Sequence, residues 1–201
     1  MSMMRPGLRG VTLIELAVVV GLVALMLAAV VPSASTWIRN TQIRNVATSM
    51  QAGLQRARAE AMRRNTNVRF TLVSLTDSAV MDNSCAAAEN GVSWVVSLDD
   101  PAGSCATAPS DTTTPRIIDK VATGTAGKVT MSGNDAAGQD ATTVVFNGFG
   151  RAVDATGLNT LDVDNSSPGD NYRALRIVVG AGGTIRMCEP RVTATSDPRK
   201  C

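Results

Sequence analysis

Hydrophobic residues fill the start of the chain, recur with a helical period in its next part, and fall into short runs after that. Residues 11–31 form an apolar run of 21 residues that carries one charge, Glu15, and ends before Pro32. A helix of this length is roughly 30 Å long, which matches the hydrocarbon core of a bilayer. The pattern therefore predicts a membrane-spanning helical segment over residues 11–31.

Beyond Pro32, apolar or small residues recur every three or four positions, as on one face of a helix. This stripe consists of Ile43, Val46, Met50, Leu54, Ala57 and Ala61. The polar run Asn65-Thr66-Asn67 ends the pattern. We expect an amphipathic helical segment over residues 32–66 that turns its stripe toward a core.

After residue 67, short runs rich in β-branched and apolar residues predict strands. The predicted strands are 68–73, 94–98, 129–131, 142–146, 175–179 and 184–187. Glycines at 148–150 and 180–183 predict turns, and polar residues in 99–114 and 154–171 predict exposed loops. The order of these elements predicts an α+β fold in which the long helix packs on an antiparallel β domain formed by residues 67–201.

Composition narrows the possible functions. The 201 residues include no histidine, which excludes the usual general base, the histidine-dependent nucleophiles and most catalytic zinc sites. Aromatic residues make up 3% of the chain, which is too few for rows of base-stacking rings. We expect a protein that is not an enzyme and has no cofactor or metal. Asp162, Asp164 and Asp170 lack the pattern of a calcium loop and are expected in a solvated acidic loop.

The net charge of +2 is unevenly distributed: residues 39–69 carry +6 and residues 70–150 carry −6. Arg56, Arg58, Arg63 and Arg64 are expected to form a solvated face of the helix. Arg5 and Arg9 precede the apolar run. The positive-inside rule therefore places the first ten residues in the cytoplasm and the chain after Pro32 on the opposite side of the membrane.

Neither a cleaved secretory signal nor a plain membrane anchor accounts for Glu15. A secretory signal would have a shorter apolar region, followed here by a small-residue site at Ser33-Ala34-Ser35. A plain anchor explains the length, but an ionisable group facing lipid costs about 2.5 to 3.5 kcal/mol. The carboxylate therefore requires a compensating partner.

Residues 10–16, Gly-Val-Thr-Leu-Ile-Glu-Leu, resemble the class III signal of type IV prepilins and type II secretion pseudopilins. The resemblance implies a leader over residues 1–10, cleavage between Gly10 and Val11 by prepilin peptidase, and N-methylation of Val11. It also implies that Glu15 faces the α-amine of a neighbouring subunit in the filament core, where a paired charge is tolerated. Val11 stands where the family usually has phenylalanine.

Three further stretches resemble the GspH/FimT-type pseudopilins and minor pilins: residues 54–65 (LQRARAEAMRRN), 143–151 (TVVFNGFGR) and 175–190. The resemblance implies a type IV pilin-like fold and a minor, low-copy pilin that primes or joins assembly with other minor pilins and a major pilin. It implies an inner-membrane protein with a periplasmic domain. The alternative is a pseudopilin of type II secretion.

Four cysteines in an exported domain favour disulfides over a metal site. Four thiols allow three pairings, and Cys85 with Cys105 and Cys188 with Cys201 is the sequential choice. The second pair is supported by resemblance to family members whose C-terminal tail is tethered near a sequence like residues 197–201.

A nucleic-acid-binding role is the rival from a different class of function. Some FimT-type pilins use a basic C-terminal G-R-x-R motif in DNA uptake, and the corresponding residues here, Gly183-Thr184-Ile185-Arg186, lack the first arginine. The basic residues Arg186, Arg191, Arg199 and Lys200 would permit weak phosphate contact. DNA is therefore a possible but disfavoured partner.

Overall fold

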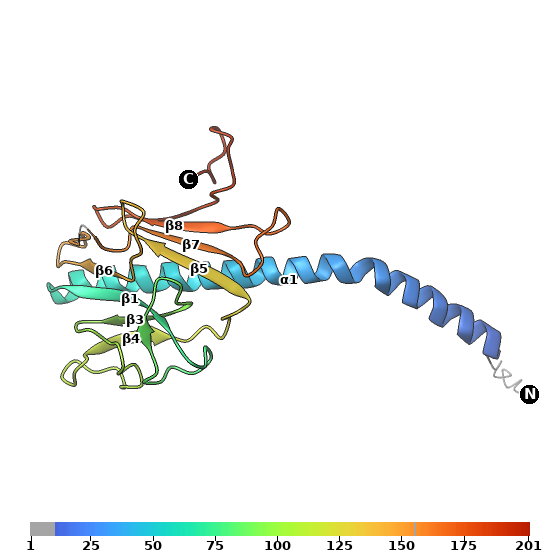
Figure 1. Ribbon diagram of the computed structural model, residues 1–201, viewed down its shortest axis with the longest axis horizontal. Helices are drawn as coiled ribbons and strands as arrows, with labels where there is room; N and C mark the ends of the chain where they lie inside the picture. The colour runs from blue at the N-terminus through green and yellow to red at the C-terminus, as the bar shows by residue number, and fades with distance from the viewer. Residues whose placement is uncertain (1–10, 155) are drawn as a thin grey trace, which may run out of the picture. The chain divides into compact units, whose positions relative to one another are not determined.

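The computed structural model describes residues 11–154 and 156–201, without the side chains of residues 27–34. The chain forms two compact units, Met1–Ile38 and Arg39–Cys201. One helix, α1 (Leu13–Arg64), contributes its first part to one unit and its second part to the other. The strands of the described residues all belong to the second unit (Figure 1).

The second part of α1 buries the predicted stripe. All six stripe residues are at most 1% exposed, as is Ala47 one position after Val46. After Arg64 the helix ends at Asn65, which has a φ of +48°, and the Thr66 amide donates to the Ala61 carbonyl at 3.2 Å. Asparagine tolerates this left-handed conformation, so it ends the helix where the sequence predicts.

In the described part of the chain, nine strands form two antiparallel sheets. The first sheet contains β1 (Val68–Ser74), β2 (Ala86–Ala87), β3 (Ser93–Ser97), β4 (Ile117–Val121) and β6 (Thr143–Phe146). Its strand order is β2-β1-β3-β4, and β6 also pairs with β1. The second sheet has the order β5-β7-β8-β9 and consists of β5 (Val129–Asn134), β7 (Thr160–Asn165), β8 (Leu175–Val179) and β9 (Ile185–Cys188).

The main core lies between the two sheets and the stripe of α1 (Figure 1). The first sheet contributes Phe70, Trp94 and Phe146, and the second contributes Leu161 and Ile177. The Phe70 and Trp94 rings lie 5.9 Å apart between centroids, and a Cβ built on Gly53 of α1 would come within 2.8 Å of both. The helix can approach these rings because it has no side chain at that position.

A second, smaller core covers the outer face of the first sheet. Val73, Val95 and Ile117 of the sheet pack there with the two half-cystines Cys85 and Cys105. The segments between β1 and β4 therefore cover this face as an ordered layer, and parts of the predicted exposed loop 99–114 belong to it.

The predicted α+β class and the antiparallel β domain are confirmed, and the β domain consists of two sheets. Strands β2, β4 and β7 are not among the predicted strands, and the expectation of a loop throughout residues 154–171 is wrong. Buried and half-buried residues alternate along β7, with Leu161 and Val163 inside and Asp162 and Asp164 on the other face. Arg176 and Arg191 bind these two carboxylates, which makes an acidic sequence compatible with a strand.

Candidate functional site

The first turn of α1 is capped by Thr12. The Glu15 amide donates to Thr12 Oγ1 at 3.3 Å, and the Leu16 amide donates to the Thr12 carbonyl oxygen at 3.1 Å. Thr12 and Glu15 have the spacing of a capping box, and the helix dipole stabilises a carboxylate in this turn. Thr12 thus sets the start of the helix, and Glu15 lies exposed on its first turn.

Exposed apolar side chains lie in and around this turn and continue along the helix after it. They are 49% to 86% exposed and comprise Val11, Leu13, Ile14, Leu16, Val18, Val19, Val20, Leu22, Val23, Leu25 and Met26. A surface this apolar marks a site of contact with lipid or protein. The first part of α1 therefore carries a large apolar contact surface with Glu15 near its beginning.

Part of the predicted N-terminal organisation lies outside the described residues. The predicted leader over residues 1–10, with Gly10 of the predicted cleavage site, is one such part, whereas Val11 is described. The predicted membrane-spanning range 11–31 extends into residues 27–34, whose side chains are not described. Within the described part of the chain, no helix combines the length and the apolarity that a membrane crossing requires.

The C-terminal end of α1 holds a buried carboxylate among arginines. Glu60 is 4% exposed, and its Oε2 accepts hydrogen bonds from Arg63 at 2.6 Å and from Arg64 at 2.9 Å. The hydrogen bond from Arg63, with that from Arg64, lowers the pKa of Glu60 against the opposing effect of burial. Arg64 also reaches Asp111 at 2.5 Å and so ties the loop before β4 to the helix.

Two glycine turns meet the same end of the helix. Arg58 Nε donates to the Gly150 carbonyl oxygen at 3.0 Å, and a Cβ on Gly183 would lie 1.8 Å from that same oxygen. Gly148 lies so close to Asn65 that a Cβ would come within 2.5 Å of its Oδ1. The predicted turns are therefore present, while the expectation of a solvated face is wrong for Arg58 and Arg64, which are half-buried.

These contacts bring together the three stretches that carry the downstream resemblance. Arg58 and Asn65 belong to residues 54–65, Gly150 to residues 143–151 and Gly183 to residues 175–190. The glycines occur where backbone approaches backbone or helix, so their role at these positions is structural.

The C-terminal basic residues do not act as four free cations. Arg191 donates to Asp164 at 2.8 Å and to the Tyr172 carbonyl at 3.0 Å, and it also bonds the Gly169 carbonyl. Arg199 binds Asp197 at 2.6 Å and lies 3.6 Å from Glu189. The hydrogen bond between Asp197 and Arg199 lowers the pKa of Asp197 to about 2.

The remaining two basic residues differ in their surroundings. Arg186 lies exposed on the edge strand β9, and no acidic group of the described residues forms an ion pair with it. Lys200 is half-buried and pairs with Glu189 through a backbone bridge. Arg186 is thus the predicted DNA-contact residue that remains available on the surface.

The C-terminal segment folds back on the end of β9. A disulfide joins Cys188 to Cys201, and the Glu189 amide donates to the Arg199 carbonyl at 2.7 Å. The Arg173 guanidinium binds Glu189 at 2.8 Å. Residues 189–201 therefore form a closed loop held by covalent, backbone and ionic contacts.

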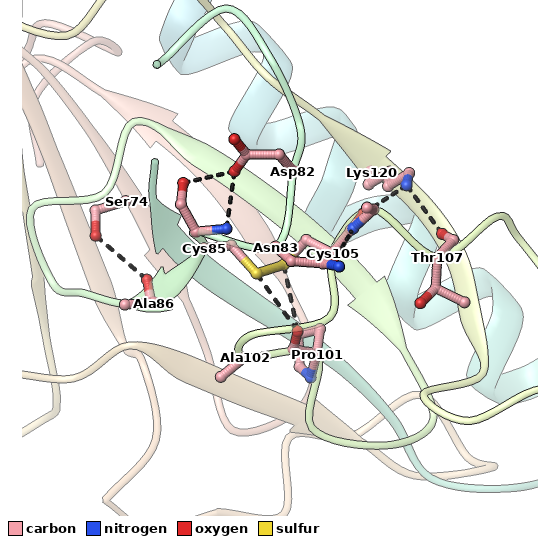
Figure 2. The surroundings of a disulfide bond; sticks show 12 residues. Ser74, Asp82, Asn83, Cys85, Ala86, Pro101, Ala102, Cys105, Thr107 and Lys120 are labelled. Carbon is pink, nitrogen blue, oxygen red and sulfur yellow. Dashed lines mark hydrogen bonds between the residues drawn. A yellow bond between two sulfur atoms is a disulfide. The ribbon is translucent and has the colours of Figure 1, made fainter. Parts of the chain in front are cut away.

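The second disulfide, Cys85–Cys105, lies in the layer over the first sheet, and Figure 2 shows its surroundings. Asn83 Oδ1 accepts a hydrogen bond from the Ala106 amide at 2.9 Å. Lys120 Nζ of β4 donates to the carbonyl oxygens of Cys105 at 2.5 Å and Thr107 at 2.9 Å, and burial lowers its pKa. Both disulfides have the sequential pairing.

In the described part of the chain, no group of three or more potential ligands among His, Cys, Asp and Glu has the arrangement of a metal site. Asp162 binds Arg176 at 2.7 Å and Asp164 binds Arg191 at 2.8 Å. These carboxylates already have cationic partners, so they act as strand residues in an ionic network.

The roles of Thr12 and Glu60 are not among the sequence predictions. Thr12 has a signal that could have been recognised, because Thr-x-x-Glu before an apolar run is the pattern of a capping box. Glu60 has none of comparable strength, since its burial depends on how the helix end meets the loop containing Asp111.

Comparison with known proteins places these features in a family. Residues 46–183 match the family model described as "Type II transport protein GspH". Two crystal structures of the type IV minor pilin FimU from Pseudomonas aeruginosa strain PAO1 are also similar. One is 16% identical over 77% of this chain and 96% of that chain, with a TM-score of 0.48. The other is 15% identical over 75% and 99%, with a TM-score of 0.45. No curated protein matches this chain.

Proposed function

Because the chain belongs to the GspH family of type II transport proteins, we propose that it is a low-copy minor pilin that primes or joins the assembly of a type IV pilus. The family match confirms the predicted resemblance to GspH-type subunits. In this proposal, prepilin peptidase cuts between Gly10 and Val11, the Val11 amine is methylated, and the retained helix enters the filament.

The observation that supports this function best is the difference in burial between the two parts of α1. Its first part exposes apolar side chains after Glu15, and its second part buries the stripe from Ile43 to Ala61 in the β domain. One helix thus offers an apolar surface for assembly and also forms part of the folded domain. In the filament, Glu15 faces the α-amine of an adjacent subunit, where the two charges compensate each other.

Before assembly, we propose, the helix holds the chain in the inner membrane. Arg5 and Arg9 keep the leader in the cytoplasm, and the domain after residue 31 lies in the periplasm. Two disulfides fit that oxidising compartment. The partners in assembly are other minor pilins and a major pilin, and the chain itself has no catalytic role in this proposal.

A second candidate is a pseudopilin of type II secretion, and the description of the matching family favours it. The same helix serves both functions, so the two differ in the filament that receives the subunit. Deletion of the gene would abolish surface pili in the first case and protein secretion in the second. DNA uptake is disfavoured because Arg191 and Arg199 are bound to acidic side chains.

The proposal is tested by the N-terminus of the mature protein. Intact-mass and peptide analysis of the chain from sheared filaments should find N-methylated Val11 as the first residue. A chain that begins within or just after Ser33-Ala34-Ser35 would identify a secretory signal instead. An intact leader in the wild-type protein would identify a plain anchor.

A further inference from the structure

Phe149 is the most exposed aromatic ring outside the first part of α1 in the described residues, at 82% exposed. It stands at the tip of the turn that follows β6. The chain has three phenylalanines, and the other two, Phe70 and Phe146, are fully buried in the core. An exposed ring of this size is a candidate for an interface anchor.

The turn that carries Phe149 is held in one conformation. Asn147 Oδ1 accepts hydrogen bonds from the Phe149 amide at 3.0 Å and the Arg151 amide at 3.1 Å. The Asn147 amide donates to the Arg151 carbonyl at 3.0 Å, and Gly150 has a φ of +73°. The ring is therefore presented on a closed, hydrogen-bonded turn, which lowers the entropy lost when it is buried by a partner.

The helix end fixes this turn in space. Arg58 bonds the Gly150 carbonyl, and Gly148 and Gly183 approach Asn65 and Gly150 too closely to carry a Cβ. Met62, which is 45% exposed, lies against Gly150 and adds an apolar side chain to the surface at this turn. Four separate contacts thus hold the turn that carries Phe149.

Two arginines without ion-pair partners among the described residues belong to this turn or bind it: Arg151 follows Gly150, and Arg58 bonds the Gly150 carbonyl. Arg58 and Arg151 form no ion pair with any acidic group that the structure describes, whereas Arg63 and Arg64 are bound to Glu60. An apolar anchor on a turn that also carries or binds two such arginines is complementary to an apolar pocket with carboxylates at its rim.

We propose that Phe149 and Met62 anchor this chain to a neighbouring filament subunit that offers an apolar pocket rimmed by carboxylates. This inference rests on the proposed function, because a subunit placed in a filament by α1 has other subunits as its fixed neighbours. Phe149 fills the pocket, and Arg58 and Arg151 pair with its rim. The contact is additional to the apolar contacts of α1 and specifies which subunit lies next to this end of the helix.

The geometry favours a protein over a nucleic acid at this site. Single-stranded nucleic acid binds to successive stacking rings along a basic groove. Here one ring is present, and Arg63 and Arg64 of the nearby helix end are ion-paired with Glu60. A single rigid aromatic side chain with an apolar neighbour is typical of a protein interface.

Site-specific photo-crosslinking in the full-length chain tests the proposal. A photoreactive phenylalanine analogue replaces Phe149 in cells that assemble the filament, and the same analogue at Val80, which is 51% exposed, is the matched control. Mass spectrometry of the filament fraction should identify a crosslink from position 149 to another subunit with a prepilin signal, and none from position 80. No crosslink, equal crosslinks at both positions, or a crosslink to DNA or lipid would overturn the inference.

Side-chain truncation gives an independent readout. F149A should lower the filament-bound fraction of the chain about 10-fold, V80A should leave it within about 2-fold, and F149Y should restore it. Equal incorporation of F149A and V80A would overturn this inference while leaving the proposed function intact. Absence of the wild-type chain from the filament fraction would instead overturn the proposed function and this inference with it.

Discussion

The guanidinium of Arg58 donates from Nε to the carbonyl oxygen of Gly150, 92 residues further along the chain, at 3.0 Å. Gly183 approaches the same oxygen from the turn between β8 and β9. One carbonyl therefore connects α1, the turn after β6 and the second sheet. Because three segments meet there, a change at one glycine should affect the stability of the whole domain.

We expect Gly183→Ala to be strongly destabilising and Gly182→Ala to be nearly neutral. A Cβ at Gly183 would lie 1.8 Å from the Gly150 oxygen, and the φ of Gly183 is +79°, whereas Gly182 has open space around it. The left-handed conformation costs roughly 1–2 kcal/mol and overpacking another 1–3 kcal/mol. Urea unfolding of the full chain in detergent measures both variants. Equal stabilities would show that the turn moves away freely.

Glu60→Gln should lower the free energy of unfolding by about 1–3 kcal/mol near pH 7, because it removes a buried anion that several arginines bind. Water screens part of these ion pairs, because the Arg56 and Arg63 side chains are 52% and 62% exposed, so the loss of free energy should not exceed the upper end of that range. Asp111→Asn is the matched control. Its carboxylate is 70% exposed, so we expect a loss below about 1 kcal/mol.

Because the pKa of Glu60 is lowered in the folded protein, we expect the free energy of unfolding to depend on pH. Interaction with Arg63 and Arg64 lowers the folded-state pKa of Glu60 below its unfolded value of about 4.3. Its stabilisation is therefore fully present above that pH and is lost as the pH falls through the lower, folded-state pKa. The difference in unfolding free energy between wild type and Glu60→Gln should shrink below about pH 4. A constant difference from pH 7 to pH 3 would contradict this assignment.

Much of the fold could be predicted from local pattern. The stripe from Ile43 to Ala61 has a helical period, and every member is buried because that period places all of them on one side of α1. Strand β8 has the predicted bounds. In β7, by contrast, Asp162 and Asp164 made an alternating strand look like a loop. Their partners Arg176 and Arg191 lie 14 and 27 residues away, where no local pattern indicates them.

In the site, too, the features with a local sequence pattern could be predicted, and those that depend on distant residues could not. The turn at residues 148–150 was recognisable from its glycines, and the start of α1 could have been recognised from Thr12 and Glu15. The role of Arg58 could not, because its acceptor is a main-chain carbonyl that any residue would offer. The exposure of Phe149 was equally hidden, since a phenylalanine between glycines is compatible with burial or with display.

Binding to DNA should stay at the weak level of non-specific contact. The soluble fragment from Ser33 should bind duplex DNA with a Kd of about 10⁻⁴ to 10⁻⁶ M at physiological salt. Arg191 and Arg199 are already bound to acids, so Arg186→Ala should change this value no more than Arg44→Ala, a control on the exposed face of α1. Gel shifts provide the measurement. Sub-micromolar binding that Arg186→Ala abolishes would favour a DNA-uptake role.

Glu15→Gln should permit insertion and cleavage but prevent incorporation into filaments. The capping contact at this position runs from the Glu15 main-chain amide to Thr12, so glutamine preserves the start of the helix. What it removes is the charge that would compensate the Val11 α-amine of a neighbouring subunit, and an unpaired amine in an apolar bundle costs several kcal/mol. Gly10→Val is the contrasting variant. It should block cleavage and leave a full-length precursor in the membrane.

Immunoblots of sheared filaments and of membranes distinguish the two variants. Processed Glu15→Gln should be found in membranes and be missing from filaments, whereas Gly10→Val should remain at precursor size. Thr12→Ala provides a control for the helix cap: it loses the hydrogen bond to the Glu15 amide but keeps the charge, so it should still enter filaments. Normal incorporation of Glu15→Gln would show that the carboxylate is not the assembly contact. Its presence in the first turn would then follow from the helix dipole alone, which stabilises an acidic group there by about 0.3–1 kcal/mol.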